Sequence, residues 1–263
     1  MEKLIVIKIG GNVIDDSEKL HHFLKAFADL KGNKILVHGG GKMATKLTKE
    51  MGVEAKMING RRITDLETLR IVTMVYAGLI SKNLVAQLQM FSCNALGLSG
   101  ADGNLIKANK RPVNDIDYGF VGDLDENSIQ KENLVKLITN GFIPVFSAIT
   151  HDGESQLLNT NADTIASALA VAMSNIYETS LVYCFEKKGV LMDVNDENSI
   201  IREINPTKYQ DLIAKGIIAD GMLPKLHNAF EAINKGVKEV FIGKADDLNE
   251  LESSGLLGTR LIK

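Results

Sequence analysis

The sequence predicts an α/β protein, built as a three-layer sandwich around a mostly parallel central sheet. Short apolar runs alternate along the chain with longer segments of helical period. The runs are apolar on both faces, as expected for strands of a parallel sheet that helices cover on both sides. The chain has 263 residues, which is enough for one large domain or for two closely joined lobes.

The elements follow one another in a regular order. The predicted strands are residues 4–9, 35–37, 95–98, 142–146, 181–185 and 239–242. The predicted helices are residues 17–30, 42–51, 65–91, 130–139, 162–173, 206–215 and 223–235. This strand–helix alternation is typical of a doubly wound sheet.

Two helix starts carry capping signals. Thr64 with Glu67 forms a capping-box pattern before the long helix. Asn205 followed by Pro206 places a capping side chain before a proline at the first helical position. Residues 104–123 are polar and weakly periodic, and we expect an antiparallel hairpin there that could cover a pocket. The best division of the chain into lobes falls at Ser174, giving residues 1–174 and 175–263.

Glycines follow the first two strands directly. Gly10 and Gly11 end the first strand, and Gly39, Gly40 and Gly41 lie between the second strand and a helix. Such turns fall at the carboxyl edge of a parallel sheet, where backbone N–H groups and a helix N-terminus favour a phosphate or carboxylate. Two tight turns without a ligand are the plainer alternative.

Three known glycine motifs fit poorly. The P-loop pattern fails, because Met43 follows Gly41-Lys42 and Leu36 occupies the place of the first glycine. The dinucleotide fingerprint matches loosely at residues 39–44, but the acidic residue expected about 20 positions later is missing. The stretch around His38 is similar to a hydrolase oxyanion loop, yet the chain contains no G-x-S-x-G elbow.

A few charged residues are candidates for function. Lys8 ends an otherwise apolar strand, where an unpaired ammonium would be costly. Asp163 follows two asparagines at a helix start, where Asn161 is the expected cap. Lys225 lies in the first turn of a helix, a position that opposes the helix dipole. Arg62 could bind a carboxylate through its two-pronged guanidinium, or could be a solvated arginine.

Composition excludes several classes of protein. The net charge is −3, and no basic stripe with interleaved aromatic residues indicates nucleic-acid binding. Cys93 and Cys184 lie in apolar runs and are expected to be buried thiols rather than a disulfide or metal site. We find no metal-ligand spacing, no signal peptide and no apolar run of spanning length, so a cytoplasmic protein without membrane contact is expected.

Eight ordered segments resemble the amino acid kinase family over essentially the whole chain, most closely its members that phosphorylate N-acetyl-L-glutamate. The segments are residues 8–11, 38–41, 59–64, 97–103, 119–122, 159–163, 220–225 and 258–260. The resemblance implies the family fold and an ATP-dependent transfer to a side-chain carboxylate, in arginine biosynthesis. It also implies Mg²⁺ carried by the nucleotide phosphates, and a homodimer built through the helix at residues 65–91.

The resemblance also implies residue roles. Lys8 and Lys225 would neutralise the transferred phosphoryl group, and Asp163 would orient both lysines. Backbone donors to phosphate and substrate would come from Gly10, Gly11, Gly40 and Gly41, and the acylated amino acid would be held by Arg62, Asn159 and Asn161. The lobe of residues 1–174 would bind that substrate, and the lobe of residues 175–263 would bind ATP.

One segment departs from the family pattern. A Ser/Thr-Asp pair usually follows the strand that begins the nucleotide lobe, whereas this chain has Phe185 and Glu186 there, which affects adenine and ribose binding. Relatives regulated by arginine carry an extra N-terminal helix, and because this chain begins at a strand we expect no arginine inhibition. Three alternatives stay open: the same chemistry on N-succinylglutamate, a non-catalytic amino-acid or nucleotide sensor, and an NAD-dependent enzyme.

Overall fold

An eight-stranded sheet forms the centre of the protein, here described by a computed structural model that covers residues 1–58, 61–218 and 222–263. Neighbouring strands follow the order β12-β14-β13-β11-β1-β2-β8-β5, and within it β13 and β14 are antiparallel while the other neighbours are parallel. The bounds of these strands are β1 Lys3–Ile9, β2 Asn33–His38, β5 Ala95–Leu98, β8 Ile143–Ser147, β11 Glu178–Phe185, β12 Glu203–Ile204, β13 Glu239–Lys244 and β14 Thr259–Leu261. The six predicted strands are thus confirmed.

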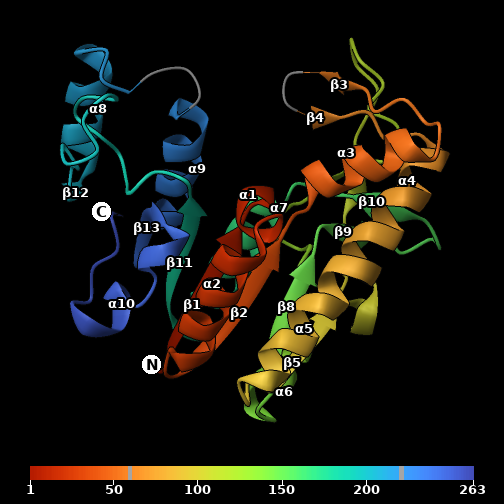
Figure 1. Ribbon diagram of the computed structural model, residues 1–263, viewed down its shortest axis with the longest axis horizontal. Coiled ribbons are helices and arrows are strands. Elements are labelled where there is room, and N and C mark those ends of the chain that lie inside the picture. Colours follow the sequence, from red (N-terminus) through yellow and green to blue (C-terminus); the bar gives the residue numbers. More distant parts are fainter. Residues whose placement is uncertain (59–60, 219–221) are drawn as a thin grey trace.

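Helices cover both faces of this sheet, which confirms the predicted three layers (Figure 1). On one face α2 (Ser17–Asp29) packs against α5 (Ser81–Met90), and on the other α7 (Ala162–Met173) packs against α9 (Leu223–Asn234). The remaining helices are α1 Gly11–Ile14, α3 Gly41–Glu50, α4 Leu66–Thr73, α6 Lys131–Thr139, α8 Pro206–Ala214 and α10 Glu250–Ser253, with short 3₁₀ turns at Asp102–Asn104 and Ala245–Asp247.

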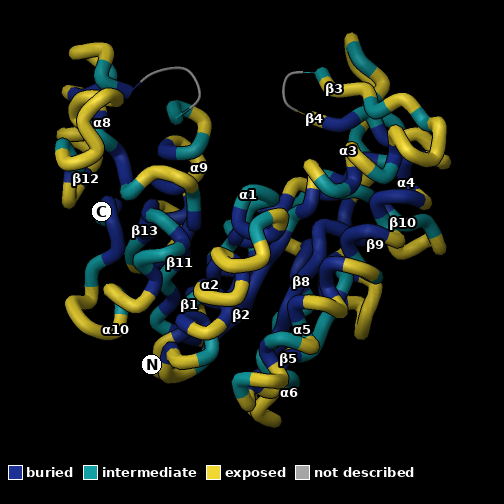
Figure 2. Tube along the Cα trace, in the orientation of Figure 1, coloured by how far each residue is buried: buried dark blue, intermediate teal, exposed yellow. Residues whose placement is uncertain are grey.

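The core lies between the sheet and its helices, and the middle strands are its most buried part (Figure 2). Leu4, Val6, Ile7 and Ile9 of β1 are fully buried, because helices cover this strand from both faces. The two cysteines are free and buried, as expected. Burial of such side chains contributes roughly 1.5–3 kcal/mol each, so the central strands form a rigid base for the loops at their ends.

The predicted helix of residues 65–91 is not one plain α-helix. It consists of α4, a π-helical segment Met74–Ile80, and α5. The run Leu66–Met90 is long and apolar enough to cross a membrane by length and composition, contrary to the expectation from sequence. In this fold it packs against α2, β5 and β8, as a core helix of a globular protein does.

The capping predictions had mixed outcomes. The prediction for Thr64 was wrong: Asp65 is the cap of α4 and accepts a hydrogen bond from the Thr68 amide at 2.8 Å. Thr64 instead pairs through its backbone, its N–H donating to Tyr118 O and its carbonyl accepting from Phe120 N. The prediction for Asn205 is confirmed, since its side chain accepts from the Lys208 amide at 2.8 Å.

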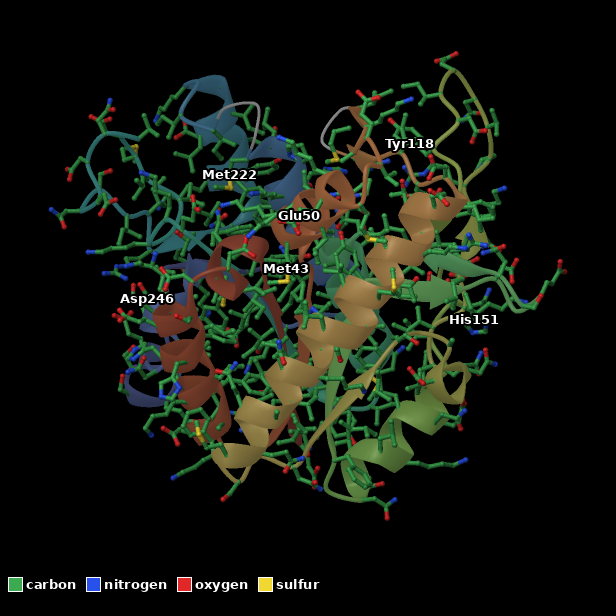
Figure 3. The ribbon with its side chains drawn as sticks, turned by 45° about the vertical axis from the view of Figure 1, so that its right-hand side comes forward. Met43, Glu50, Tyr118, His151, Met222 and Asp246 are labelled. Carbon is green, nitrogen blue, oxygen red and sulfur yellow. The ribbon has the colours of Figure 1, made fainter. Side chains whose placement is uncertain are left out.

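Short strand pairs stand above the carboxyl edge of the sheet. The predicted hairpin is present, with β6 (Asn109–Lys110) antiparallel to β7 (Gly122–Asp123). The other pairs are β3 (Met57–Ile58) with β4 (Arg61–Arg62), and β9 (Ile149–His151) with β10 (Leu157–Asn159). Tyr118, on the hairpin loop, and Met222, before α9, mark two sides of this edge (Figure 3). The motif residues Asn59, Gly60, Asp220 and Gly221 lie outside the described residues.

Candidate active site

Three neighbouring strands end together at the site. In the parallel register Ile9 of β1 pairs with His38 of β2 on one side and with Cys184 of β11 on the other. The segments that follow are therefore neighbours: Gly10 and Gly11, the turn from Gly39 to Gly41, and Phe185. The sheet register brings together glycine turns that are about 30 residues apart in the chain.

Gly40 lies in close contact with the long helix. A Cβ added at this residue would lie 2.2 Å from Ile80 Cδ1 and 3.1 Å from Tyr76 Cδ1. Both neighbours belong to the π-helical segment, where the wider turn changes which side chains face the glycine. Gly40 therefore lets the N-terminus of α3 approach the helix, and the first amides of α3 have no side-chain cap. Those amides are free to donate to an anion.

An ion pair joins the first strand to α7. The Lys8 Nζ lies 2.8 Å from Asp163 Oδ1, with 12% and 28% of the two side chains exposed. Asn161 caps α7 and accepts from the Thr164 amide at 3.1 Å, which fixes the helix start and so the place of Asp163 in the first turn. The predicted cap at Asn161 is confirmed, and Lys8 and Asp163 meet although 155 positions separate them.

The second predicted lysine reaches the same region from the far end of the chain. The Lys225 Nζ lies 4.0 Å from the centre of the Phe185 ring, and the Lys8 Nζ lies 5.9 Å from the same centre. Desolvation lowers the pKa of Lys225 below its ordinary value, Asp163 opposes that shift, and the Lys8 charge adds to it. Phe185 thus places an aromatic ring near two cations, a contact that stabilises them.

A pocket of 260 Å³ lies beside Lys8 and contains most of the predicted substrate residues. Its lining includes the predicted residues Lys8, Gly10, Gly11, Gly40, Gly41, Arg62, Asn159, Asn161 and Asp163. Arg62 is 7% exposed, and its Nη2 donates to Gly41 O at 3.1 Å and to Thr45 Oγ1 at 2.7 Å. Its buried Nη1 has no acceptor among the described residues. An arginine held in this way can bind a carboxylate.

Asn159 and Asn161 differ in what they can offer to a ligand. Asn159 Nδ2 donates to Thr64 Oγ1 at 3.0 Å, which holds its amide at the pocket wall. The oxygen of Asn161 is used in capping α7, so its Nδ2 is the group left for a ligand. Both asparagines therefore have one amide atom engaged with the protein and the other available.

Sequence reasoning assigned no role to Arg61, Tyr76 or Arg111, which also line this pocket. Arg111 follows β6 on the hairpin, and its guanidinium forms a two-pronged ion pair with Asp123 of β7. The Arg111 side chain lies over the Tyr118 ring at 5.1 Å. The signal was present in part, because residues 104–123 were expected to cover a pocket and Arg111 is a basic residue of that hairpin.

A second pocket of 430 Å³ lies on the other side of the glycine turns. It shares Gly10, Gly11 and Gly41 with the first pocket, and contains Lys225 where the first contains Lys8. Phe185 and Glu186 line it, and Glu186 accepts a hydrogen bond from Asn12 Nδ2. The two pockets therefore meet at glycine backbone, with a lysine on each side.

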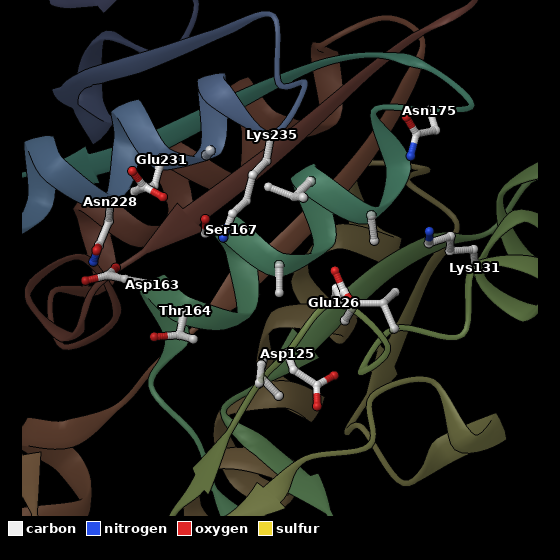
Figure 4. A pocket seen from close by; sticks show the side chains of 16 residues that line it. Asp125, Glu126, Lys131, Asp163, Thr164, Ser167, Asn175, Asn228, Glu231 and Lys235 are labelled. Atoms are coloured by element: carbon white, nitrogen blue, oxygen red, sulfur yellow. The ribbon is translucent and has the colours of Figure 1, made fainter.

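A larger hollow, of 610 Å³, lies elsewhere, between α7, α9 and the segment of residues 124–131 (Figure 4). Of the described residues it shares only Asp163 with the 260 Å³ pocket. Its walls mix acidic and basic side chains, including Glu126, Glu231 and Lys235, and contain no glycine turn. The convergence of lysines and glycine amides is at the two smaller pockets.

This arrangement suits the transfer of an anionic group between two bound molecules. Two lysines and the amides of α3 can neutralise charge on phosphoryl oxygens, and such transfer depends on positioning and electrostatics more than on covalent help. Within the described residues no group of three or more His, Cys, Asp or Glu side chains is arranged to hold a metal ion. A divalent cation held mainly by phosphates and water would fit such a site.

Comparison with known proteins agrees with this chemistry. Residues 3–244 match the model described as the amino acid kinase family. The chain is 55% identical over 264 residues to the acetylglutamate kinase of Cytophaga hutchinsonii, covering all of this chain and 99% of that protein. It is 53% identical over 262 residues to the acetylglutamate kinase of Bacteroides fragilis, covering all of this chain and 98% of that protein.

Solved structures agree on the fold. A Streptococcus mutans protein superposes with a TM-score of 0.76 at 29% identity, covering 98% of both chains. Giardia lamblia carbamate kinase bound to AMP-PNP superposes with a TM-score of 0.69 at 16% identity, covering all of this chain and 99% of that one.

Proposed function

The chain belongs to the amino acid kinase family, and from that premise we propose that it transfers the γ-phosphoryl group of ATP to the γ-carboxylate of N-acetyl-L-glutamate. The product is N-acetyl-glutamyl 5-phosphate, an intermediate of arginine biosynthesis. One observation carries the proposal: the two pockets meet at Gly10, Gly11 and Gly41, with Lys8 on one side and Lys225 on the other. An acceptor in one pocket and a nucleotide in the other would face each other across this junction.

The residues act mainly by holding charge in place. The γ-carboxylate is ionised at neutral pH and needs no base to become a nucleophile. As the phosphoryl group moves, negative charge develops on its oxygens and on the leaving β-phosphate. Lys8 and Lys225 stabilise that charge, and the 2.8 Å ion pair with Asp163 keeps Lys8 aimed at the junction. When bound, Mg²⁺ would neutralise phosphate charge, held by phosphate oxygens and water.

The lobes have separate tasks in this proposal. Residues 1–174 supply the substrate pocket, where Arg62 binds the α-carboxylate and Asn159 and Asn161 hold the acylamino group. Residues 175–263 supply most of the nucleotide side, where Phe185 and Glu186 lie next to Lys225. A sensor on the same fold would not need both lysines, so their presence favours an enzyme.

We further propose a homodimer in the cytoplasm, formed through the long helix. The helix carries the exposed apolar residues Leu66, Met74, Leu79 and Met90, which are 46–61% exposed. Exposed apolar patches mark interfaces in many proteins, and these side chains would be covered in a dimer. Light scattering of the purified protein should give the mass of two chains, and a monomer at micromolar concentration would contradict this.

The reaction can be tested directly. Purified protein with MgATP, hydroxylamine and an N-acylated glutamate should form hydroxamate, because hydroxylamine traps an acyl phosphate. Free glutamate should react much more slowly, since its ammonium replaces the neutral acylamino group beside the arginines of the pocket. Equal rates with free and acylated glutamate would refute the proposed specificity, and no hydroxamate with any of them would refute the kinase function.

A further inference from the structure

A third lysine lies at the junction of the two pockets, on the nucleotide side. Lys42, the second residue of α3, lines the 430 Å³ pocket together with Lys187 and Lys225, and it does not line the 260 Å³ pocket. It follows Gly41 directly, and Gly41 is shared by both pockets. Lys42 therefore stands where the phosphate chain of a nucleotide would reach the junction.

The side chain of Lys42 begins against the first glycine turn. A Cβ added at Gly11 would lie 3.8 Å from both the Cγ and the backbone N of Lys42. The aliphatic stem of the lysine thus lies next to the residue whose backbone is expected to approach phosphate. A long flexible side chain that starts there can bring its ammonium to an anion held at the turn. Lys46, one helical turn farther along α3, lines neither pocket.

Asp15 lies near this lysine but is not a close partner of it. A tight ion pair would hold the pKa of Asp15 below its ordinary value. Burial instead raises this pKa, and the Lys42 charge opposes the rise without overcoming it. Among the described residues no carboxylate oxygen lies within 4.0 Å of the Lys42 Nζ. In that part of the chain the ammonium has no close counter-ion.

The place of Lys42 in its helix is unfavourable for a cation unless an anion is bound. It lies in the first turn of α3, where the helix dipole already gives positive potential. This turn has no acidic residue and no side-chain cap to compensate that potential. The start of α9, which carries Lys225, has the same two features. Two helix starts, each with an added lysine, thus line one pocket.

The other charges of the nucleotide pocket nearly balance. Lys187 forms an ion pair with Glu197 at 3.9 Å. In net charge Glu186 offsets Lys225, which leaves Lys42 as the surplus cation among the described lining residues. MgATP is still an anion after the metal has neutralised part of its charge, and a pocket with net positive charge attracts it. The surplus charge therefore fits a nucleotide phosphate.

We propose that Lys42 is a further catalytic residue, which binds the β-phosphate of ATP from the lobe of residues 1–174, opposite Lys225 of the other lobe. This inference rests on the proposed kinase function. The γ-phosphoryl group would lie at the shared glycines, so the β-phosphate is the next group inside the nucleotide pocket. Lys42 and Lys225 line that pocket, whereas Lys8 lines the other.

The β-phosphate is where a lysine helps the reaction most. A bond forms between the γ-phosphorus and a carboxylate oxygen of the acceptor, and the bond from the γ-phosphorus to the bridging oxygen breaks. Its electron pair stays on that oxygen, so negative charge builds on the β-phosphate of the departing ADP. A cation at this phosphate stabilises the transition state more than the ground state, and Lys42 would thereby raise kcat.

Nucleotide binding without turnover tests the contact itself. Calorimetric titration with MgATP, MgADP and AMP, in the absence of an acylglutamate, gives a Kd for each nucleotide with the wild type and with Lys42→Met. We expect Kd for MgATP and MgADP to rise about 10-fold in the variant, the lower end of the range for a hydrogen bond between charged groups, because Lys42 is exposed in the free protein. AMP has no β-phosphate and should bind both proteins equally.

Kinetics test the catalytic part of the proposal. In the hydroxamate assay Lys42→Met should lower kcat about 10-fold and leave KM for the acylglutamate unchanged. Lys42→Arg keeps a cation and should recover most of the loss. Lys46→Met is the matched control, because Lys46 is an exposed lysine of the same helix outside both pockets, and it should behave as the wild type in both assays.

Asp15→Asn separates a phosphate contact from a structural one. If Lys42 served mainly to compensate Asp15, this variant would weaken MgATP binding as Lys42→Met does. We expect Asp15→Asn to bind MgATP at least as tightly as the wild type, because it removes a negative charge near the phosphates.

The outcomes separate this inference from the proposed function. Lys42→Met with wild-type Kd for MgATP and MgADP overturns the inference and leaves the kinase function intact. Equal losses for ATP, ADP and AMP, or the same loss in Asp15→Asn, assign Lys42 a structural role and also overturn it. A wild type that neither binds MgATP nor forms hydroxamate refutes the kinase function itself. If Lys42→Met does not fold, Lys42→Gln, which keeps a polar side chain, decides by the same criteria.

Discussion

Replacing Lys8 and Lys225 one at a time by methionine should lower kcat similarly but change the stability of the fold in opposite directions. Both ammonium groups face the junction of the two pockets, and both lie near the Phe185 ring. Removing one preorganised donor to a developing anion typically lowers kcat about 10²- to 10³-fold, equivalent to about 3–4 kcal/mol. We expect that loss for each variant, with much smaller changes in KM.

For Lys8 the stability change follows from its ion pair. Unit charges 2.8 Å apart attract each other by about 6 kcal/mol at an effective dielectric constant of about 20. Desolvation offsets much of that attraction, but Lys8→Met leaves Asp163 without its partner while 28% of the Asp163 side chain is exposed. Removing one partner of a fully buried pair costs about 3–5 kcal/mol. Because this pair is partly exposed, we expect a loss of about 2–3 kcal/mol.

For Lys225 the sign is reversed. Desolvation lowers its pKa, with a further contribution from the Lys8 charge that Asp163 opposes. A lysine whose folded-state pKa is lowered is charged at a cost at neutral pH, and this cost disappears only above the folded pKa. Methionine removes the charge and keeps an apolar contact with Phe185. Because Lys225 is partly exposed, solvent screens much of this cost, and we expect Lys225→Met to raise the free energy of unfolding by about 0.5 kcal/mol at most.

Two measurements on each variant check this prediction. The hydroxamate assay at saturating MgATP and acylglutamate gives kcat, and urea titration at pH 7 gives the free energy of unfolding. Lys46→Met is the control, because Lys46 is an exposed lysine of α3 outside both pockets, and it should change neither quantity. A Lys225→Met variant with wild-type kcat, or with a loss of stability as large as that of Lys8→Met, would refute the reasoning.

Three further predictions follow from the site. A lysine at residue 62 cannot contact Gly41 O and a carboxylate at the same time, so Arg62→Lys should raise KM for the acylglutamate about 10- to 100-fold and leave KM for ATP unchanged. A rise in KM for ATP alone would contradict this. Gly40→Ala should cost about 1–3 kcal/mol of stability in a urea titration and most of the activity, because its Cβ would lie 2.2 Å from Ile80 Cδ1 and because side chains rarely adopt the φ of +157° at this residue; an alanine variant with wild-type stability would refute the steric cause. Burial lowers the pKa of His38 to about 4, so the folded protein favours the neutral ring, and this stabilisation is complete above about pH 6.5 and is lost as the pH falls toward 4. In urea titrations over that pH range the wild type should lose about 3 kcal/mol more stability than His38→Asn, and equal losses would contradict the prediction.

The regular elements could be predicted because their signals are local. Both faces of β1 and β2 are buried, so their sequences are apolar without alternation and are recognisable as parallel strands. Asn161 and Asn205 cap helices through contacts within three residues, and both were predicted correctly. The glycine turns follow directly after strands, so their place at the carboxyl edge of the sheet follows from the fold class.

The remaining features depended on contacts between distant segments. Thr64 and Asp65 are both good capping residues. Asp65 is the N-cap of α4, because the backbone of Thr64 pairs with the hairpin loop at Tyr118 and Phe120. The π-helical segment arises where the helix packs against Gly40, a contact that its own sequence does not reveal.

The sequence by itself determined the fold class, the family and the residues that can neutralise a phosphoryl group. Only the tertiary structure decided which charges share a space. Lys8 and Asp163 meet because the sheet register and the start of α7 bring them to 2.8 Å, and Arg111 enters the substrate pocket because a hairpin pairs with the segment after β4. Secondary structure is set by interactions over a few residues, whereas a pocket's charge balance is the sum of side chains from several elements.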